Sequence, residues 1–210
     1  IAAYAIGSAH GILYVRAEYR YLCPYLEEVL EQRRQDGLLG KDILIDDAEQ
    51  TYFSFDIRIQ IGAGAYICGE ESSLISSCEG KRGEPKNKPP YPAECGYLGY
   101  PSIVNNVETF CNIPPILANG AQWFKAIGTD KSHGTKLLSV SGDCGKPGIY
   151  EVPMGIRLSE VLALAKAHEP EAVQVGGASG VMVGSNEFDR QLCFEDLPTA
   201  GAITIFSRPR

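Results

Sequence analysis

Phe55-Asp-Ile-Arg-Ile-Gln-Ile-Gly-Ala-Gly-Ala-Tyr-Ile-Cys-Gly-Glu-Glu71 is the stretch that decides the fold class of this chain. Its first half alternates large apolar side chains with Asp56, Arg58 and Gln60, which is the pattern of a half-buried β-strand. Two closely spaced glycines follow, and a pair of glutamates then opens a short helical pattern that ends at Gly80. The sequence therefore predicts a strand, a glycine-rich turn and a helix in direct succession.

A strand and a helix are also predicted upstream of this stretch. Residues 12–19 are rich in β-forming side chains, and residues 46–54 are interpreted as a polar connection. Between them an apolar stripe at helical spacing comprises Leu22, Tyr25, Leu26, Val29 and Leu30. Pro24 suits a first helical turn, and Gly37 suits the helix end. Strand, helix and strand in about fifty residues predict an α/β layer.

The pattern changes downstream. Residues 81–99 are rich in proline and glycine and predict an irregular loop. Asn105 and Glu108 have the spacing of a capping box, which predicts a helix through Cys111 that ends at Pro114-Pro115.

Beyond a transition at residues 120–134, the sequence predicts short strands at 136–141, 148–152 and 173–175. A helical stripe lies among them at Leu158, Val161, Leu162 and Ala165. This order suits a small α+β module resembling a β-grasp, with a domain boundary near residue 130.

Composition excludes several classes of function. With 19 basic and 26 acidic residues, the net charge of −7 disfavours nucleic-acid binding, which needs a basic face. No apolar run reaches the roughly 20 residues of a membrane span. The start at Ile1 has neither an initiator methionine nor a signal-peptide layout, so we expect a chain cut from a longer one.

The seven cysteines contain no CxxC pair, and the three histidines have no metal-binding spacing. We therefore expect reduced, mostly buried thiols in a cytoplasmic protein, and no metal site within this chain.

The turn that contains Gly62, Gly64 and Gly69 allows a ligand to approach the backbone closely. It is not the GxGxxG dinucleotide fingerprint, because no third glycine lies at the required offset. Glu70 and Glu71 suit a first helical turn but repel phosphate, so this turn should face ring edges or ribose hydroxyls. Plain helix capping is the alternative, and spacing alone favours it, because acidic first turns are common.

Two further segments could bind a ligand. Residues 81–88 hold four cations in a chain that is acidic overall, which makes a phosphate site plausible; Tyr91 then offers a flat ring for stacking. A solvated basic loop is the alternative for this segment. Asn105 and Asn106 offer donors and acceptors for a flavin or nicotinamide edge, unless Asn105 only caps its helix.

The motifs GAGAYICGEES (62–72), EGKRGEP (79–85), KPPYPA (88–93) and VNNVETF (104–110) together resemble the NADH-binding, FMN-carrying subunit family. That family includes the 51-kDa-type subunit of respiratory complex I, the diaphorase subunit of NAD-reducing hydrogenase, and the β subunit of NAD-dependent formate dehydrogenase. The resemblance implies a partial flavin- and NADH-binding α/β domain at residues 1–130. A β-grasp-like, SLBB-type module at residues 131–206 follows it.

The resemblance also implies roles for single residues. Tyr66, Gly69, Glu70, Asn105 and Asn106 would line FMN, with Gly62 and Gly64 in the same turn. Glu71 would lie near the nicotinamide, Lys88 would contact the dinucleotide, and Tyr91 would stack on its adenine. Hydride transfer between NAD(H) and FMN needs no catalytic acid or base from the protein.

In the family, the FMN-phosphate segment lies upstream of Ile1 and the [4Fe–4S] cysteines lie downstream of Arg210. We therefore expect the isolated fragment to be inactive, although the full subunit would be a flavin-dependent NADH:acceptor oxidoreductase. Its partners would be iron–sulfur subunits, such as a 24-kDa-type [2Fe–2S] subunit, and hydrogenase or complex I modules. A non-catalytic docking or scaffold module of the same family is the main alternative, and an unrelated phosphate-binding α/β domain is a third.

Overall fold

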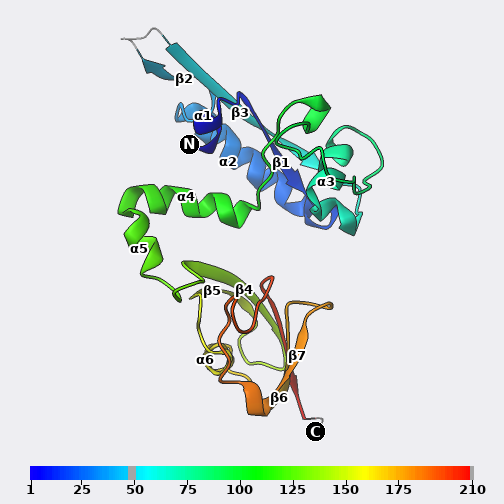
Figure 1. Ribbon diagram of the computed structural model, residues 1–210, viewed down its shortest axis with the longest axis vertical. Helices are drawn as coiled ribbons and strands as arrows, with labels where there is room; N and C mark the ends of the chain where they lie inside the picture. Colours follow the sequence, from blue (N-terminus) through cyan, green and yellow to red (C-terminus); the bar gives the residue numbers. More distant parts are fainter. Residues whose placement is uncertain (47–50, 209–210) are drawn as a thin grey trace. The chain divides into compact units, whose positions relative to one another are not determined.

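The computed structural model describes residues 1–46 and 51–208, and it divides into two compact units, Ile1–Phe110 and Cys111–Arg210. Each unit contains one sheet with helices beside it (Figure 1). The predicted α/β class is confirmed at this level, since both units mix helices with strands.

The first unit is built on a three-stranded sheet in the order β1-β3-β2. Its regular elements are α1 (Ala2–Ile6), β1 (His10–Val15), α2 (Cys23–Gln35), β2 (Gly40–Asp46), β3 (Thr51–Ile61) and α3 (Glu71–Cys78). Short 3-10 helices cover Ala17–Leu22, Tyr66–Gly69 and Tyr97–Gly99.

β1 and β3 pair in parallel, with His10 opposite Asp56 and Val15 opposite Ile61. A parallel pair needs a crossover, and α2 supplies it. Arg34 near the end of α2 fixes the helix to β3, because its guanidinium lies 3.1 Å from the Asp56 carboxylate and 3.1 Å from the Ile57 carbonyl oxygen. The predicted strand–helix–strand layer is confirmed.

Two details of the first unit differ from the prediction. The strand predicted at residues 12–19 ends at Val15, and a 3-10 helix follows it. The polar connection predicted at residues 46–54 is wrong in part, because Asp46 ends β2 and residues 51–54 begin β3; residues 47–50 lie outside the described residues. These two strands form an antiparallel pair, and the exposed Leu44 and Ile45 hide its periodicity.

The connection into the second unit is helical. α4 (Val107–Asn119) runs on through Pro114 and Pro115, so the helix end predicted there is wrong. A proline inside a helix lacks an N–H donor and crowds the preceding turn, which kinks a helix or ends it; here the helix continues past both prolines. The Gly120 N–H closes the end of α4 on the Ile116 carbonyl oxygen at 2.8 Å. α5 (Ala121–Lys125) then occupies part of the predicted transition.

The second unit is a five-stranded mixed sheet in the order β5-β4-β8-β6-β7. Its elements are β4 (Thr135–Gly142), β5 (Gly148–Pro153), α6 (Leu158–Leu164), β6 (Pro170–Val175), β7 (Val181–Gly184), a 3-10 helix at Ser185–Glu187, and β8 (Ala202–Ser207). β4 and β8 are parallel, and the other pairs are antiparallel. The core lies between α6 and one face of the sheet, and its fully buried side chains include Leu138, Leu158, Val173, Ile203 and Ile205. The three predicted strands and the predicted helix are confirmed.

All seven cysteines are free thiols. Only Cys68 and Cys193 are buried, while Cys95 and Cys111 are exposed. The expectation of mostly buried thiols is therefore wrong. Cysteine is a small side chain, and in this chain most of its positions lie on helix ends and loops rather than in the sheet core.

Candidate functional site

The glycine turn that follows β3 makes close backbone contacts on one side and leaves open space on the other. Gly62 donates its N–H to the Val15 carbonyl oxygen at 2.8 Å, and a β-carbon at Gly62 would lie 2.3 Å from the Tyr14 hydroxyl oxygen. Gly64 has a φ of 84°, in the left-handed region that favours glycine. A β-carbon at Gly69 would meet nothing within 4 Å. Tyr66, between them, is 85% exposed.

Glu70 is the N-cap of α3. Its Oε2 accepts the backbone N–H groups of Ser72 at 2.9 Å and Ser73 at 3.0 Å, and also the Ser72 hydroxyl proton. These bonds, with the Ser72 hydroxyl first, hold the pKa of Glu70 below its ordinary value, and Lys88 adds to the effect. The capping interpretation is therefore correct for Glu70, whose Oε1 alone remains free of the cap.

Lys88 joins both glutamates to the basic loop. Its Nζ hydrogen-bonds to Glu71 Oε1 and lies 3.4 Å from Glu70 Oε1. The hydrogen bond to Glu71 raises the pKa of Lys88. The same Nζ lies 6.0 Å from the centroid of the Tyr91 ring, which is 54% exposed. Glu70, Glu71, Lys88 and Tyr91 thus form one surface cluster at the start of α3.

This cluster changes the electrostatic prediction. The sequence suggested that the glutamates face rings while Lys88 meets a phosphate. In the structure Lys88 is neutralised by two carboxylates, so the cluster carries a net charge of about −1 at neutral pH. Of the other cations in residues 81–88, Lys81 pairs with Glu79 at 2.7 Å and Arg82 pairs with Glu84 at 3.1 Å. The loop is therefore a much weaker phosphate site than its composition indicates.

The loop at residues 81–99 is fixed to α3 at both ends of the helix, by contacts that no sequence pattern predicts. At the start of α3, the Ser72 hydroxyl oxygen accepts the Lys86 N–H at 2.8 Å. At its end, the largely buried Glu79 carboxylate accepts the Leu98 N–H at 2.8 Å as well as the Lys81 ammonium. The Lys81 hydrogen bond is the largest cause of the lowered pKa of Glu79. A cavity of about 280 Å³ lies between helix and loop.

Asn105 and Asn106 are both exposed and lie just before α4. The Asn106 Oδ1 accepts the Glu108 N–H at 2.9 Å, so Asn106 caps the start of the helix. The prediction gave the capping role to Asn105, one residue earlier. Among residues 1–46 and 51–208, contacts join four of the predicted site residues, Glu70, Glu71, Lys88 and Tyr91, and none of these contacts involves an asparagine amide.

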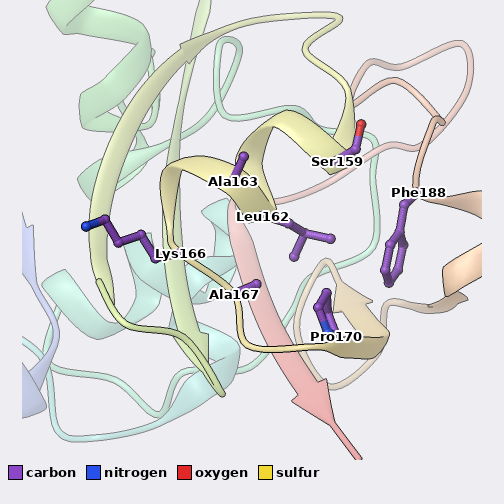
Figure 2. A pocket seen from close by; sticks show the side chains of 7 residues that line it. All are labelled: Ser159, Leu162, Ala163, Lys166, Ala167, Pro170 and Phe188. Atoms are coloured by element: carbon purple, nitrogen blue, oxygen red, sulfur yellow. The ribbon is translucent and has the colours of Figure 1, made fainter.

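The second unit has its own hollow, of about 460 Å³, beside α6 (Figure 2). Leu162 and Phe188 point into it, and Lys166 is its one ionisable side chain. It contains none of the predicted site residues. Among residues 1–46 and 51–208 there is no group of three or more His, Cys, Asp or Glu side chains that could hold a metal ion. Within the same part of the chain, no helix is both long and apolar enough to cross a membrane.

A family model described as the Nuo51 FMN-binding domain matches residues 1–115, which include the whole glycine turn, α3 and the basic loop. The chain belongs to the Nuo51 FMN-binding domain family. The family indicated by the sequence motifs is thereby confirmed.

Two relatives and one solved structure extend the match beyond the Nuo51 FMN-binding domain. The NAD-reducing hydrogenase HoxS subunit alpha of Cupriavidus necator is 56% identical over 211 residues, which cover 100% of this chain and 34% of that protein. The NADP-reducing hydrogenase subunit HndC of Solidesulfovibrio fructosivorans is 46% identical over 208 residues, covering 97% of this chain and 41% of that protein.

A crystal structure of NAD+-reducing [NiFe]-hydrogenase in the H2-reduced state superposes with a TM-score of 0.86 at 44% identity, over 98% of this chain and 34% of that chain. The fold of both units therefore matches a segment of that hydrogenase. This chain spans less than half the length of either relative.

Proposed function

We propose that this chain is the part of an NADH dehydrogenase (diaphorase) subunit that binds FMN and NAD(H). The observation that carries the proposal is the cluster of Glu71, Lys88 and Tyr91 beside the exposed Tyr66 turn, within a Nuo51 FMN-binding domain. In the complete enzyme, electrons would pass one at a time to iron–sulfur clusters of other subunits.

The glycine turn fits a flat, uncharged ring system. The space next to Gly69 is open, and Tyr66 presents most of its ring to solvent without packing against the fold. An isoalloxazine edge carries both donors and acceptors, so it could use the backbone groups of the turn and the Glu70 Oε1, which the helix cap does not use and which Lys88 approaches at 3.4 Å. Asn105 and Asn106 would supply further amide contacts. FMN, when bound there, supplies the chemistry: it accepts a hydride and releases electrons singly.

The Glu71–Lys88–Tyr91 cluster fits the dinucleotide. A carboxylate suits ribose hydroxyls or the nicotinamide amide, which donate hydrogen bonds to it. The ammonium group of Lys88 is already paired with Glu70 and Glu71, so the dinucleotide would have to compete with these carboxylates to contact it. Tyr91 lies beside Lys88 with about half of its surface free for an adenine ring. These residues bind and orient the substrate, and none of them acts as a general acid or base.

We further propose that the sheet-containing part of the second unit is a β-grasp-like, SLBB-type module. Its support is the strand order β5-β4-β8-β6-β7, with two central parallel strands and one helix on the core face. On this view residues 131–206 form the module and residues 1–130 belong to the flavin domain. The seven scattered cysteines fit no iron–sulfur cluster, so a [4Fe–4S] centre and a 24-kDa-type [2Fe–2S] partner would have to be supplied from outside these residues.

The test is NADH:ferricyanide reductase activity of the full-length protein isolated with FMN. We expect Lys88→Ala and Glu71→Gln each to raise the KM for NADH about tenfold, with kcat changed far less, because each removes a contact made to the bound dinucleotide. Lys146→Ala is the matched control, because Lys146 is an exposed lysine in the second unit.

The same assay separates the alternatives. A full-length protein that binds neither FMN nor NADH would support the scaffold interpretation and overturn this proposal. If the wild type is active and Lys88→Ala and Glu71→Gln have the same KM and kcat as the wild type, the proposed activity stands but neither residue belongs to the NADH site. Running NADPH beside NADH identifies the nucleotide, since one relative is named as NAD-reducing and the other as NADP-reducing.

A further inference from the structure

Ser72 is a buried serine, 6% exposed, whose one hydroxyl group takes part in two interactions at once. The hydroxyl donates its proton to Glu70 Oε2 and accepts the backbone N–H of Lys86 at 2.8 Å. A hydroxyl has one donor and two acceptor positions, so both interactions can form together. Ser72 thus lies between the glycine turn and the basic loop.

The two groups that Ser72 joins belong to the two halves of the proposed site. Glu70 caps α3 and ends the glycine turn, on the side where FMN is proposed to bind. Lys86 precedes Lys88 by two residues in the loop, on the side where the dinucleotide is proposed to bind. The further contacts of the loop with α3 include the ion pair of Lys88 with Glu71 and, beyond Tyr91, the Glu79–Leu98 hydrogen bond.

We infer that Ser72 is a positioning residue that sets the distance between the flavin side and the dinucleotide side of the site through its single hydroxyl group. The inference rests on the proposed function. Without the hydroxyl, the Lys86 N–H loses its acceptor and Glu70 loses one of the bonds that orient it. At the start of α3, the segment that contains Lys88 and Tyr91 is then held by the ion pairs of Lys88 with Glu70 and Glu71, whose long side chains fix the backbone less closely than the Ser72–Lys86 bond does.

The neighbouring residue provides a matched control. Ser73 lies next on the same helix, is fully buried, and in the described part of the chain its Oγ has no hydrogen-bond partner. Both serines have the same helix propensity and occupy the same helical turn. Removing one hydroxyl breaks two interactions, and removing the other breaks none.

The experiment compares Ser72→Ala, Ser72→Thr and Ser73→Ala in the full-length protein with FMN bound. We expect Ser72→Ala to raise the KM for NADH about tenfold while kcat falls no more than about threefold, and to weaken FMN binding. Ser72→Thr keeps a hydroxyl group and should restore the KM to near the wild-type value. Ser73→Ala should match the wild type in both constants.

A second pair of variants approaches the same bond from the loop. Lys86→Pro removes the N–H donor, whereas Lys86→Ala removes the charge and keeps the donor. Only Lys86→Pro should raise the KM for NADH. This pair decides the question if Ser72→Ala does not fold.

Each failure has its own meaning. If the wild type oxidises NADH and Ser72→Ala behaves as Ser73→Ala does, the inference is overturned and the proposed function stands. If Lys86→Pro and Lys86→Ala give the same KM, the Lys86 N–H plays no part and the inference fails in the same way. A wild type that binds FMN without reacting with NADH would overturn both.

Discussion

Each unit of the molecule contains a glutamate that accepts a hydrogen bond from a serine hydroxyl. The two glutamates differ in what their second carboxylate oxygen contacts. In the second unit, Glu195 accepts from Ser132 on one oxygen and Thr129 on the other, and the Ser132 oxygen accepts the Phe194 N–H at 3.0 Å. Both carboxylate oxygens are therefore used within the loop contacts of that unit. In the first unit, Glu70 and Ser72 lead outward to the exposed Lys88 and Tyr91.

The difference extends to the packing around the clusters. The principal core, from Leu138 to Ile205, lies in the second unit, and Leu158, Val173 and Ile203 are fully buried there. The first unit leaves large aromatic side chains on its surface, among them Tyr21, Tyr66 and Tyr91. A carboxylate whose two oxygens both accept hydrogen bonds within its own unit serves stability. A carboxylate that keeps one oxygen toward an exposed lysine, beside a free glycine backbone, is suited to bind a ligand.

The largest expected effect tests the closed core. Leu158→Ala removes a fully buried side chain from α6 and should lower the free energy of unfolding of the second unit by about 2–5 kcal/mol. Leu164→Ala, on the same helix but 49% exposed, should cost less than about 0.5 kcal/mol. Hydrogen exchange of β4 and β8 amides in urea measures both. Equal effects would show that α6 does not hold the core as described.

The next test uses two glycines of the proposed site. Gly62→Ala places a β-carbon 2.3 Å from the Tyr14 hydroxyl oxygen, so it should destabilise the first unit by about 1–3 kcal/mol. Gly69→Ala meets no protein atom within 4 Å and should leave stability unchanged. If the open space receives the flavin, Gly69→Ala should still weaken FMN binding about tenfold. Urea titration and fluorimetric FMN titration separate the two effects.

Unchanged FMN affinity in Gly69→Ala would remove that glycine from the flavin site. Lower stability in Gly69→Ala would show that the space is filled by protein, against the description of an open turn.

The smallest effect concerns the closed cluster. Hydrogen bonds from Ser132 and Thr129 lower the pKa of Glu195 to about 2 from an ordinary value of 4.5. A carboxyl with a depressed pKa in the folded state stabilises the fold fully above pH 4.5, and this contribution is lost as the pH falls toward 2. The melting temperature of Glu195→Gln should therefore fall less steeply than that of the wild type over that range. Parallel curves would show that the cluster contributes nothing to acid stability.

The elements with a strong local period could be predicted from sequence. β3 has a strict alternation from Phe55 to Ile61, and the parallel partner and crossover helix follow from it. β2 was not predicted. It is the edge strand beside β3, and its apolar Leu44 and Ile45 are both exposed, so its sequence does not alternate between apolar and polar residues. α4 was predicted to end too early because Pro114 and Pro115 were given more weight than the good helix formers that follow them.

The sequence identified residues of the candidate site but not the contacts between them. Glu70, Glu71, Lys88 and Tyr91 were all identified, yet the pairing that neutralises Lys88 depends on a loop path that spacing does not encode. Ser72 and Glu79 were missed altogether, because a serine or a glutamate in a helix is common in any sequence. Only the fold shows that both hold the loop.

The central claim is that the first unit brings NADH to a bound flavin. The most direct measurement is an anaerobic titration of the full-length protein, isolated with FMN, in which NADH is added and the visible absorbance of the flavin is followed. We predict that stoichiometric NADH bleaches the flavin, and that Lys88→Ala shifts the titration to higher NADH concentration. A protein that retains FMN and stays oxidised in excess NADH would contradict the account.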